Sequence, residues 1–111
     1  MGPRFLVSRR TWKPHLDICE NGEEVVIFGD IAGVNPEDID IEINAKAMRV
    51  SCKRAPVLNL KDGRYCLAEI QYGVFDRVIF LPSLIDTGVV SASYSNGLLQ
   101  IRMAKLQMDQ P

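Results

Sequence analysis

The chain has 111 residues, 47% of them hydrophobic and 24% charged, which is typical of one globular domain. Its 13 basic and 14 acidic residues are intermixed and leave a net charge of −1, so we expect neither a nucleic-acid nor a membrane partner. No apolar run is long enough to cross a bilayer, and the first residues do not resemble a secretory signal. A cytoplasmic protein is therefore expected.

Three cysteines, Cys19, Cys52 and Cys66, are widely spaced and form no Cys-x-x-Cys motif. This pattern favours neither a disulfide framework nor a zinc site. Cys52 continues the apolar phase of Val50, and Cys66 that of Ala68, so we expect small buried side chains in a reducing compartment. A redox switch is an alternative that the sequence does not support.

The first part of the chain predicts an arm followed by two strands. Residues 1–14 have no period and contain two prolines, so they are expected to form a short flexible arm with Trp12 as an anchor near its end. Residues 16–20 predict a short strand. An Asn-Gly turn leads into residues 23–31, which are apolar on both faces in the middle, as in the interior of a sandwich.

The next segment predicts one helical turn and an alternating strand. Asn35 is the expected cap of the turn, with Pro36 at its first position. Three isoleucines share one face of the strand (Ile39, Ile41 and Ile43), and three acidic residues share the other (Asp38, Asp40 and Glu42). An EF-hand loop needs glycine where Ile43 stands, so we expect a solvated face and no metal.

The remaining pattern completes an all-β domain. Strands are predicted over residues 48–53, 65–71 and 74–81, with a loop over 54–64 and a connector over 84–89. Residues 90–105 predict a hairpin with an Asn-Gly turn, and its second strand places Leu99, Ile101 and Met103 on the core face. About eight short antiparallel strands and no long helix favour an immunoglobulin-like β-sandwich.

The sequence offers little support for an enzyme. His15 is the only histidine, and it has no partners in sequence for a hydrolytic triad. No glycine-rich phosphate loop follows a strand, and no residues have metal-ligand spacing, so no cofactor is expected. Thiol chemistry at Cys52 or Cys66 is a distant alternative. The expected activity is binding through apolar surface and sheet edges.

Four motifs in order and spacing resemble the α-crystallin domain of the small heat shock proteins, from Trp12 to Lys105. Trp12-Lys13-Pro14-His15-Leu16-Asp17-Ile18 is similar to W-x-P-x-x-D-I, and Asp30-Ile31-Ala32-Gly33-Val34-Asn35-Pro36-Glu37-Asp38-Ile39 to D-L-P-G-V-x-P-E-D-I. Glu69, Gly73 and Phe75-Asp76-Arg77-Val78-Ile79-Phe80-Leu81-Pro82 resemble E-x-x-x-G-x-F-x-R-x-I-x-L-P. Ala92-Ser93-Tyr94-Ser95-Asn96-Gly97-Leu98-Leu99-Gln100-Ile101, ending at Lys105, resembles A-x-x-x-N-G-V-L-x-I-x-x-P-K.

The resemblance implies a stress-response chaperone that binds partly unfolded proteins without ATP, a holdase. It also implies a groove between two edge strands, for clients or for a tail. The residues expected to line it are Ile39, Ile41, Ile43, Val90, Ala92 and Tyr94. The alternative is that these six are ordinary core residues, because periodicity alone does not separate groove from core.

The resemblance further implies a homodimer formed by exchange of the loop over residues 54–64. The apolar residues of this loop would then dock on the partner's first strand, with Arg77 near the contact because its planar fork bonds carbonyls and carboxylates. The expected interface comprises Leu16, Ile18, Val57, Leu58, Leu60 and Arg77. Arg77 as a solvated strand residue is the alternative.

Departures from the family pattern concern strand ends and the tail. Ala32 and Ala104 stand where the family has proline, so these strand ends are expected to be less sharply stopped. With the domain expected over residues 15–105, residues 106–111 form a truncated tail without the Ile/Val-x-Ile/Val motif of the family. We therefore expect a dimer or small oligomer with weaker or narrower holdase activity.

Two other binding functions compete with the holdase. One is a co-chaperone adaptor of the p23/CS type, which shares the sandwich but lacks the exchanged loop and the A-x-x-x-N-G-x-L signature. The other is an assembly module that pairs with a larger small heat shock protein. Suppression of client aggregation separates the holdase from both.

Overall fold

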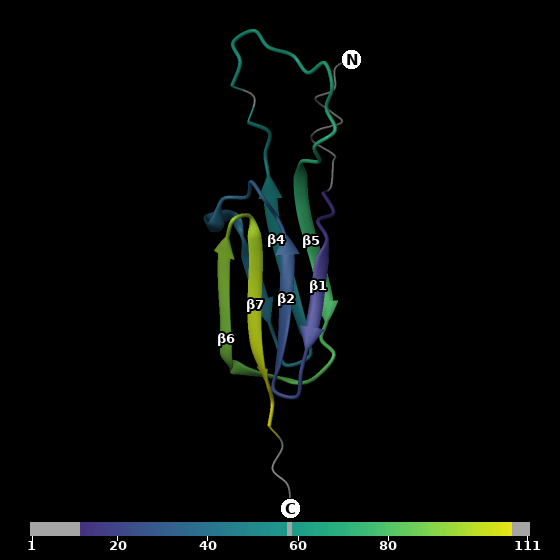
Figure 1. Ribbon diagram of the computed structural model, residues 1–111, viewed down its shortest axis with the longest axis vertical. Helices are drawn as coiled ribbons and strands as arrows, with labels where there is room; N and C mark the ends of the chain where they lie inside the picture. The colour runs from purple at the N-terminus through teal and green to yellow at the C-terminus, as the bar shows by residue number, and fades with distance from the viewer. Residues whose placement is uncertain (1–11, 58, 108–111) are drawn as a thin grey trace, which may run out of the picture.

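The computed structural model describes residues 12–57 and 59–107, which form two antiparallel sheets packed face to face (Figure 1). One sheet has the strand order β1-β2-β7-β6 and the other β3-β4-β5. The strands are β1 (Leu16–Glu20), β2 (Glu24–Asp30), β3 (Asp40–Ile43), β4 (Ala47–Arg54), β5 (Gly73–Phe80), β6 (Ile85–Ser95) and β7 (Leu98–Lys105). The all-β sandwich expected from the sequence is confirmed. Leu58 and most of the expected arm and tail, residues 1–11 and 108–111, lie outside the described residues.

The hairpin of β6 and β7 forms as its turn residues predict. Asn96 and Gly97 both have positive φ, 55° and 80°, the geometry that a two-residue hairpin turn requires. Tyr94 pairs with Leu99 and Ala92 with Ile101, so these side chains share the face that points between the sheets. β6 departs from regular pairing between Ile85 and Val90, where the register shifts.

The core lies between the two sheets and is built from alternate residues of the central strands. Val25, Ile27, Ile101 and Met103 are buried from one sheet, and they face Met48, Val50 and Cys52 from the other. Trp12 is also buried, 6.3 Å from Phe75 between ring centroids. Its expected role as an anchor is confirmed, because it closes one end of the sandwich.

The structure corrects two expectations about local structure. Residues 65–71 are predicted to form a strand, but they form none and lie in the long loop between β4 and β5. The helical turn forms over Pro36–Asp38, yet the Asn35 side chain makes no capping hydrogen bond. The Asn35 carbonyl accepts the bond from Asp38 N–H instead, at 2.9 Å.

The cysteines also differ from expectation. Cys52 is buried as predicted, whereas Cys19 and Cys66 are exposed. Cys19 lies on the outer face of the edge strand β1, and Cys66 lies in the loop between β4 and β5. The expectation of buried thiols is therefore wrong for Cys19 and Cys66.

The four edge strands meet in pairs on opposite sides of the sandwich. Trp12 N–H donates to the Val74 carbonyl (3.1 Å), and Ser83 Oγ donates to Glu20 Oε1 (3.2 Å). These bonds join the segment before β1 to the start of β5, and the end of β1 to the segment after β5, and the two strands lie beside each other in Figure 1. Because β3 and β6 are the other edges, they share the opposite side. Among the described residues, no helix is long and apolar enough to span a membrane.

Candidate functional site

The side where β3 and β6 meet carries the apolar residues expected to line a groove. Ile41 pairs with the buried Val50, and Val90 pairs with the buried Met103. Pairing with core residues directs these side chains to the space between the sheets. Five of the six predicted residues are partly buried and pack against the core, namely Ile39, Ile41, Ile43, Val90 and Tyr94. The open side is therefore a half-covered apolar seam, which we call the β3/β6 seam.

Ala92 and Tyr94 define the β6 wall of this seam. Ala92 is exposed although it points between the sheets, so its small side chain leaves part of the seam uncovered. The Tyr94 hydroxyl donates to the Ile31 carbonyl at 2.9 Å. This bond satisfies the polar end of a partly buried ring and ties β6 to the chain that follows β2.

The side where β1 and β5 meet carries the predicted interface residues. Leu16 and Ile18 point inward, because Ile18 pairs with the buried Ile27, yet Ile18 is 44% exposed. Arg77 pairs with the buried Val50 on the next strand, so it also lies on the inward face, but it is exposed. An arginine on the inward phase of an edge strand marks this side as polar and incompletely covered.

The loop between β4 and β5, residues 55–72, projects from one end of the sandwich (Figure 1). It carries several exposed apolar side chains, among them Val57 (85%), Leu60, Tyr65, Leu67 (75%) and Ile70. A turn divides the loop, since Gly63 N–H donates to the Leu60 carbonyl at 3.0 Å and Asp62 has a φ of 56°. Exposed apolar residues at this density indicate a surface that binds something.

One residue that the sequence pattern did not single out holds the base of this loop. The Arg54 side chain donates from Nε and Nη2 to the Gln71 carbonyl and from Nη1 to the Ala32 carbonyl. Its guanidinium also stacks over the Trp12 ring. Every residue has a main-chain carbonyl, so the sequence does not show which carbonyls accept these hydrogen bonds. It shows only that an arginine stands at the end of a strand.

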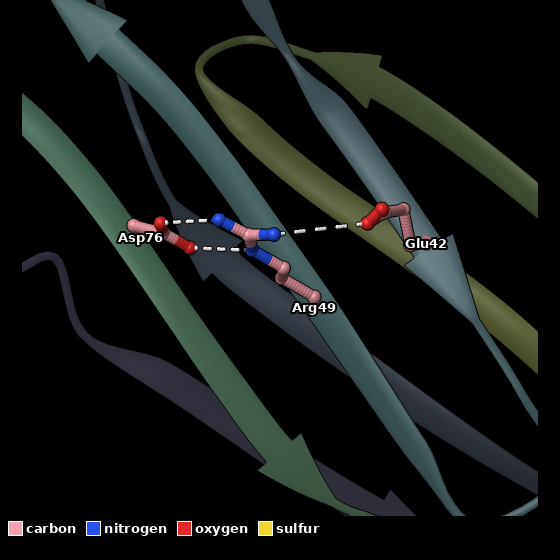
Figure 2. Close-up of polar contacts among 3 residues, drawn as sticks. All are labelled: Glu42, Arg49 and Asp76. Atoms are coloured by element: carbon pink, nitrogen blue, oxygen red, sulfur yellow. Dashed lines mark hydrogen bonds and ion pairs between the residues drawn. The ribbon is translucent and has the colours of Figure 1, made fainter.

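The outer face of the β3-β4-β5 sheet is held by an ion cluster (Figure 2). Arg49 on β4 donates to both carboxylate oxygens of Asp76 on β5, at 2.9 and 2.7 Å, and lies 3.9 Å from Glu42 on β3. The hydrogen bonds from Arg49 lower the pKa of Asp76. The acidic face predicted for β3 is therefore solvated and partly paired with the neighbouring strand.

A second polar cluster lies where β7 ends. Lys105 Nζ is 2.7 Å from Glu20 Oε1, which also accepts the bond from Ser83. The Lys105 bond, followed by the Ser83 bond, lowers the pKa of Glu20. In contrast, burial raises the pKa of the Cys52 thiol to about 11, so Cys52 stays a thiol at neutral pH.

The fold and these surfaces define a binding domain: a two-sheet sandwich with one half-covered apolar seam, one open polar edge and a projecting apolar loop. Residues 17–111 match the family model described as Hsp20/alpha crystallin family. The chain belongs to the Hsp20/alpha crystallin family, as its motifs indicated, and this membership supports a chaperone role.

Individual relatives agree with this assignment. The 18 kDa heat shock protein of Streptomyces albus G is 38% identical over 96 residues, covering 86% of this chain and 66% of the relative. Small heat shock protein C4 of Rickettsia felis is 32% identical over 98 residues, covering 88% and 60%. The chain thus spans less than two thirds of the length of these relatives.

Solved structures show the same fold. Heat shock protein 16.0 from Schizosaccharomyces pombe superposes with a TM-score of 0.81 at 25% identity, covering 91% of this chain and 94% of that one. A small heat-shock protein from Xylella fastidiosa, described as having a distinct high order structure, gives 0.78 at 28% identity, covering 90% and 92%.

Proposed function

We propose that this chain acts as an ATP-independent holdase that binds partly unfolded proteins at the β3/β6 seam. The observation that carries the proposal is the pair of inward apolar rows on two edge strands that share one open side. Partly unfolded proteins expose apolar segments and unpaired strand edges. A seam bordered by free strand edges offers a complementary surface to both.

Suppression of client aggregation tests this function. Heat-labile citrate synthase is warmed with the full chain in buffer without nucleotide, and light scattering is followed. We expect scattering to fall as the chain approaches an equimolar ratio. Unchanged client aggregation at that ratio would refute the holdase and favour an adaptor or an assembly module.

Variants at two adjacent residues test whether clients bind at the β3/β6 seam. Ala92 and Ser93 are both exposed on β6, but Ala92 lies on the phase of the seam and Ser93 on the outer face, as their partners Ile101 and Gln100 show. Ala92→Glu places a charge in the seam, so client protection is expected to fall several-fold. Ser93→Glu is the matched control and should keep full protection. Equal protection by both folded variants would exclude the seam as the client site.

We also infer that the chain forms a homodimer by loop exchange, and that the donated segment is 65–71 and not 54–64. Residues 54–64 contain Pro56, which lacks an N–H, and the turn at Leu60–Gly63, so they are poorly suited to a continuous strand. The sequence of residues 65–71 predicts a strand, but among the described residues they belong to no strand and no sheet. β1 is an edge strand, and its Ile18 is exposed. Arg77 lies on β5, the edge strand on the same side of the sandwich.

A further inference from the structure

The outer face of the edge strand β5 carries a row of exposed apolar side chains. Phe75 and Ile79 of this strand are buried in the core. Side chains alternate along a strand, so Val74, Val78 and Phe80 point outward, and they are 50%, 53% and 80% exposed. We call these three residues the β5 row. Their exposure shows that none of the described residues covers them.

The β5 row is too small for an interface between two folded chains. Such an interface buries about 800 Å² on each partner, and even an aromatic side chain buries only about 150–250 Å². Ala47, which pairs with Phe80, is the only other apolar residue at the outward positions of β3, β4 and β5. A short segment of chain, which needs few anchoring side chains, fits this surface better than a second sandwich does.

Residues 1–11 join the sandwich beside the β5 row. Trp12 N–H donates to the Val74 carbonyl at 3.1 Å, so the chain that precedes Trp12 starts next to the first residue of the row. Phe80 lies about 20 Å further along the strand, at about 3.3 Å per residue. Eleven extended residues span up to about 36 Å. A segment that turns back at Trp12 is therefore long enough to cover the whole row.

The side chains of residues 1–11 also suit this surface. Residues 5–7 are Phe-Leu-Val, and the charged side chains of the segment are three arginines, with no Asp or Glu. Asp76 lies within the β5 row, and Glu42 lies two strands away on the same outer face (Figure 2). Because opposite charges attract across a contact, this outer face favours a segment that bears only positive charge.

The cations of the sheet do not reverse this preference. Arg49 donates to both carboxylate oxygens of Asp76 and lies 3.9 Å from Glu42, so its charge is already balanced within the sheet. The outward positions of β3, β4 and β5 hold two cations, Arg49 and Lys53, and three carboxylates, Asp40, Glu42 and Asp76. An excess of negative charge therefore remains for the arginines of the segment.

We propose that residues 1–11 dock on the β5 row of their own chain. Phe5, Leu6 and Val7 cover the exposed apolar side chains, which removes apolar surface from water on both sides of the contact. The three arginines meet the carboxylates of the outer face. This contact lies on a different surface from the β3/β6 seam and requires no second chain, so it depends neither on client binding nor on loop exchange.

Photochemical cross-linking of the full chain tests the contact directly. Phe80→p-benzoylphenylalanine places a reactive benzophenone in the row, and after irradiation the linked peptides are identified by mass spectrometry. We expect a link to residues 1–11 in a product that migrates as a single chain on a denaturing gel. The matched control is Val89→p-benzoylphenylalanine, because Val89 is 56% exposed but belongs to β6 of the other sheet. It should give no link to residues 1–11.

Trypsin digestion of the native full chain provides a second readout. Trypsin cleaves after arginine, and residues 1–11 contain Arg4, Arg9 and Arg10. Val78→Ser weakens the row, so the loss of residues 1–10, followed by mass spectrometry, should become several-fold faster than in the wild type. Val89→Ser removes an equally exposed valine elsewhere and should leave the rate unchanged. Circular dichroism verifies that both variants are folded.

Other results overturn the docking and can be told apart. A two-chain product from position 80 shows that a second copy covers the row. A link that forms only when heat-labile citrate synthase is present shows that the row binds clients. Equal cleavage rates for the wild type and Val78→Ser show that the row does not hold residues 1–11. None of these results bears on the seam, which the Ala92 and Ser93 variants test separately.

Discussion

The guanidinium carbon of Arg54 lies 4.0 Å from the centroid of the Trp12 ring. The same side chain donates to the Gln71 carbonyl at 3.0 and 2.6 Å and to the Ala32 carbonyl at 2.9 Å. Arg54 therefore joins the chain before β1, the turn after β2 and the end of the long loop. It fixes where the loop leaves and rejoins the sandwich.

Removing this side chain should destabilise the fold. Arg54→Ala loses the stacking on Trp12 and the three hydrogen bonds, so we expect a loss of about 2 kcal/mol in the free energy of unfolding. Arg54→Lys should recover only part, because an ammonium cannot reproduce the planar fork. Urea denaturation measures both. Lys53→Ala, at an exposed neighbouring position, should change stability by less than about 0.5 kcal/mol, and an equal effect of both alanine variants would contradict this role.

Gly97 should be the least replaceable turn residue of the sandwich. Its φ is +80°, and an added Cβ would lie 2.8 Å from both Cα and Cβ of Ala32. Gly97→Ala combines backbone strain with a clash against main chain, so we expect a loss of about 3 kcal/mol. At Gly22 an added Cβ meets nothing within 4 Å, so Gly22→Ala is the matched control. Thermal unfolding should separate the two, and similar melting temperatures would contradict the clash.

The sequence predicts most of this fold because its central strands obey the two-residue period. Leu99, Ile101 and Met103 share one phase and are all buried, and Asn96-Gly97 is the turn that its residue types favour. These features depend on local preference and on burial at the centre of a sheet. Both are properties that a single sequence encodes.

The predictions that were wrong concern residues whose structure depends on contacts with distant parts of the chain, which a single sequence does not show. Residues 65–71 have the residue types of a strand, but a strand also needs a neighbouring strand with which to pair, and the sequence does not show one. Cys19 lies on the outward phase of the edge strand β1, so it is exposed. Arg54 acts through main-chain carbonyls that only the folded chain assembles. For the β3/β6 seam, the phase of its residues was predictable and their partial exposure was not.

The Lys105–Glu20 contact should make stability depend on pH in the acid range. Hydrogen bonds from Lys105 and Ser83 lower the pKa of Glu20 in the folded chain. A carboxyl whose folded pKa lies below its unfolded value stabilises the fold above the unfolded pKa of about 4.3, and this contribution is lost as the pH falls through the folded pKa. Glu20→Gln should therefore cost stability at pH 7, and this cost should shrink as the pH falls through the folded pKa of Glu20.

The measurement is the difference in unfolding free energy between wild type and variant, taken from urea titrations across this pH range. Glu23→Gln, on the exposed turn before β2, controls for the loss of one charge. A constant difference between wild type and Glu20→Gln from pH 7 to pH 3 would show that the carboxylate contact contributes no pH-dependent stability.

A proline substitution in the loop should show whether residues 65–71 or residues 54–64 are donated to the partner chain. Ala68 is exposed and lies outside every strand of one chain, so Ala68→Pro should leave the monomer fold intact. Proline cannot donate a ladder hydrogen bond, so a strand formed by residues 65–71 on the partner's β1 would be broken. We expect light scattering to show a dimer for the wild type and for Ala68→Ser, and a shift to monomer of at least about tenfold in dissociation constant for Ala68→Pro, since about 1.4 kcal/mol is tenfold. If Asn59→Pro disrupts the dimer and Ala68→Pro does not, residues 54–64 are the donated segment.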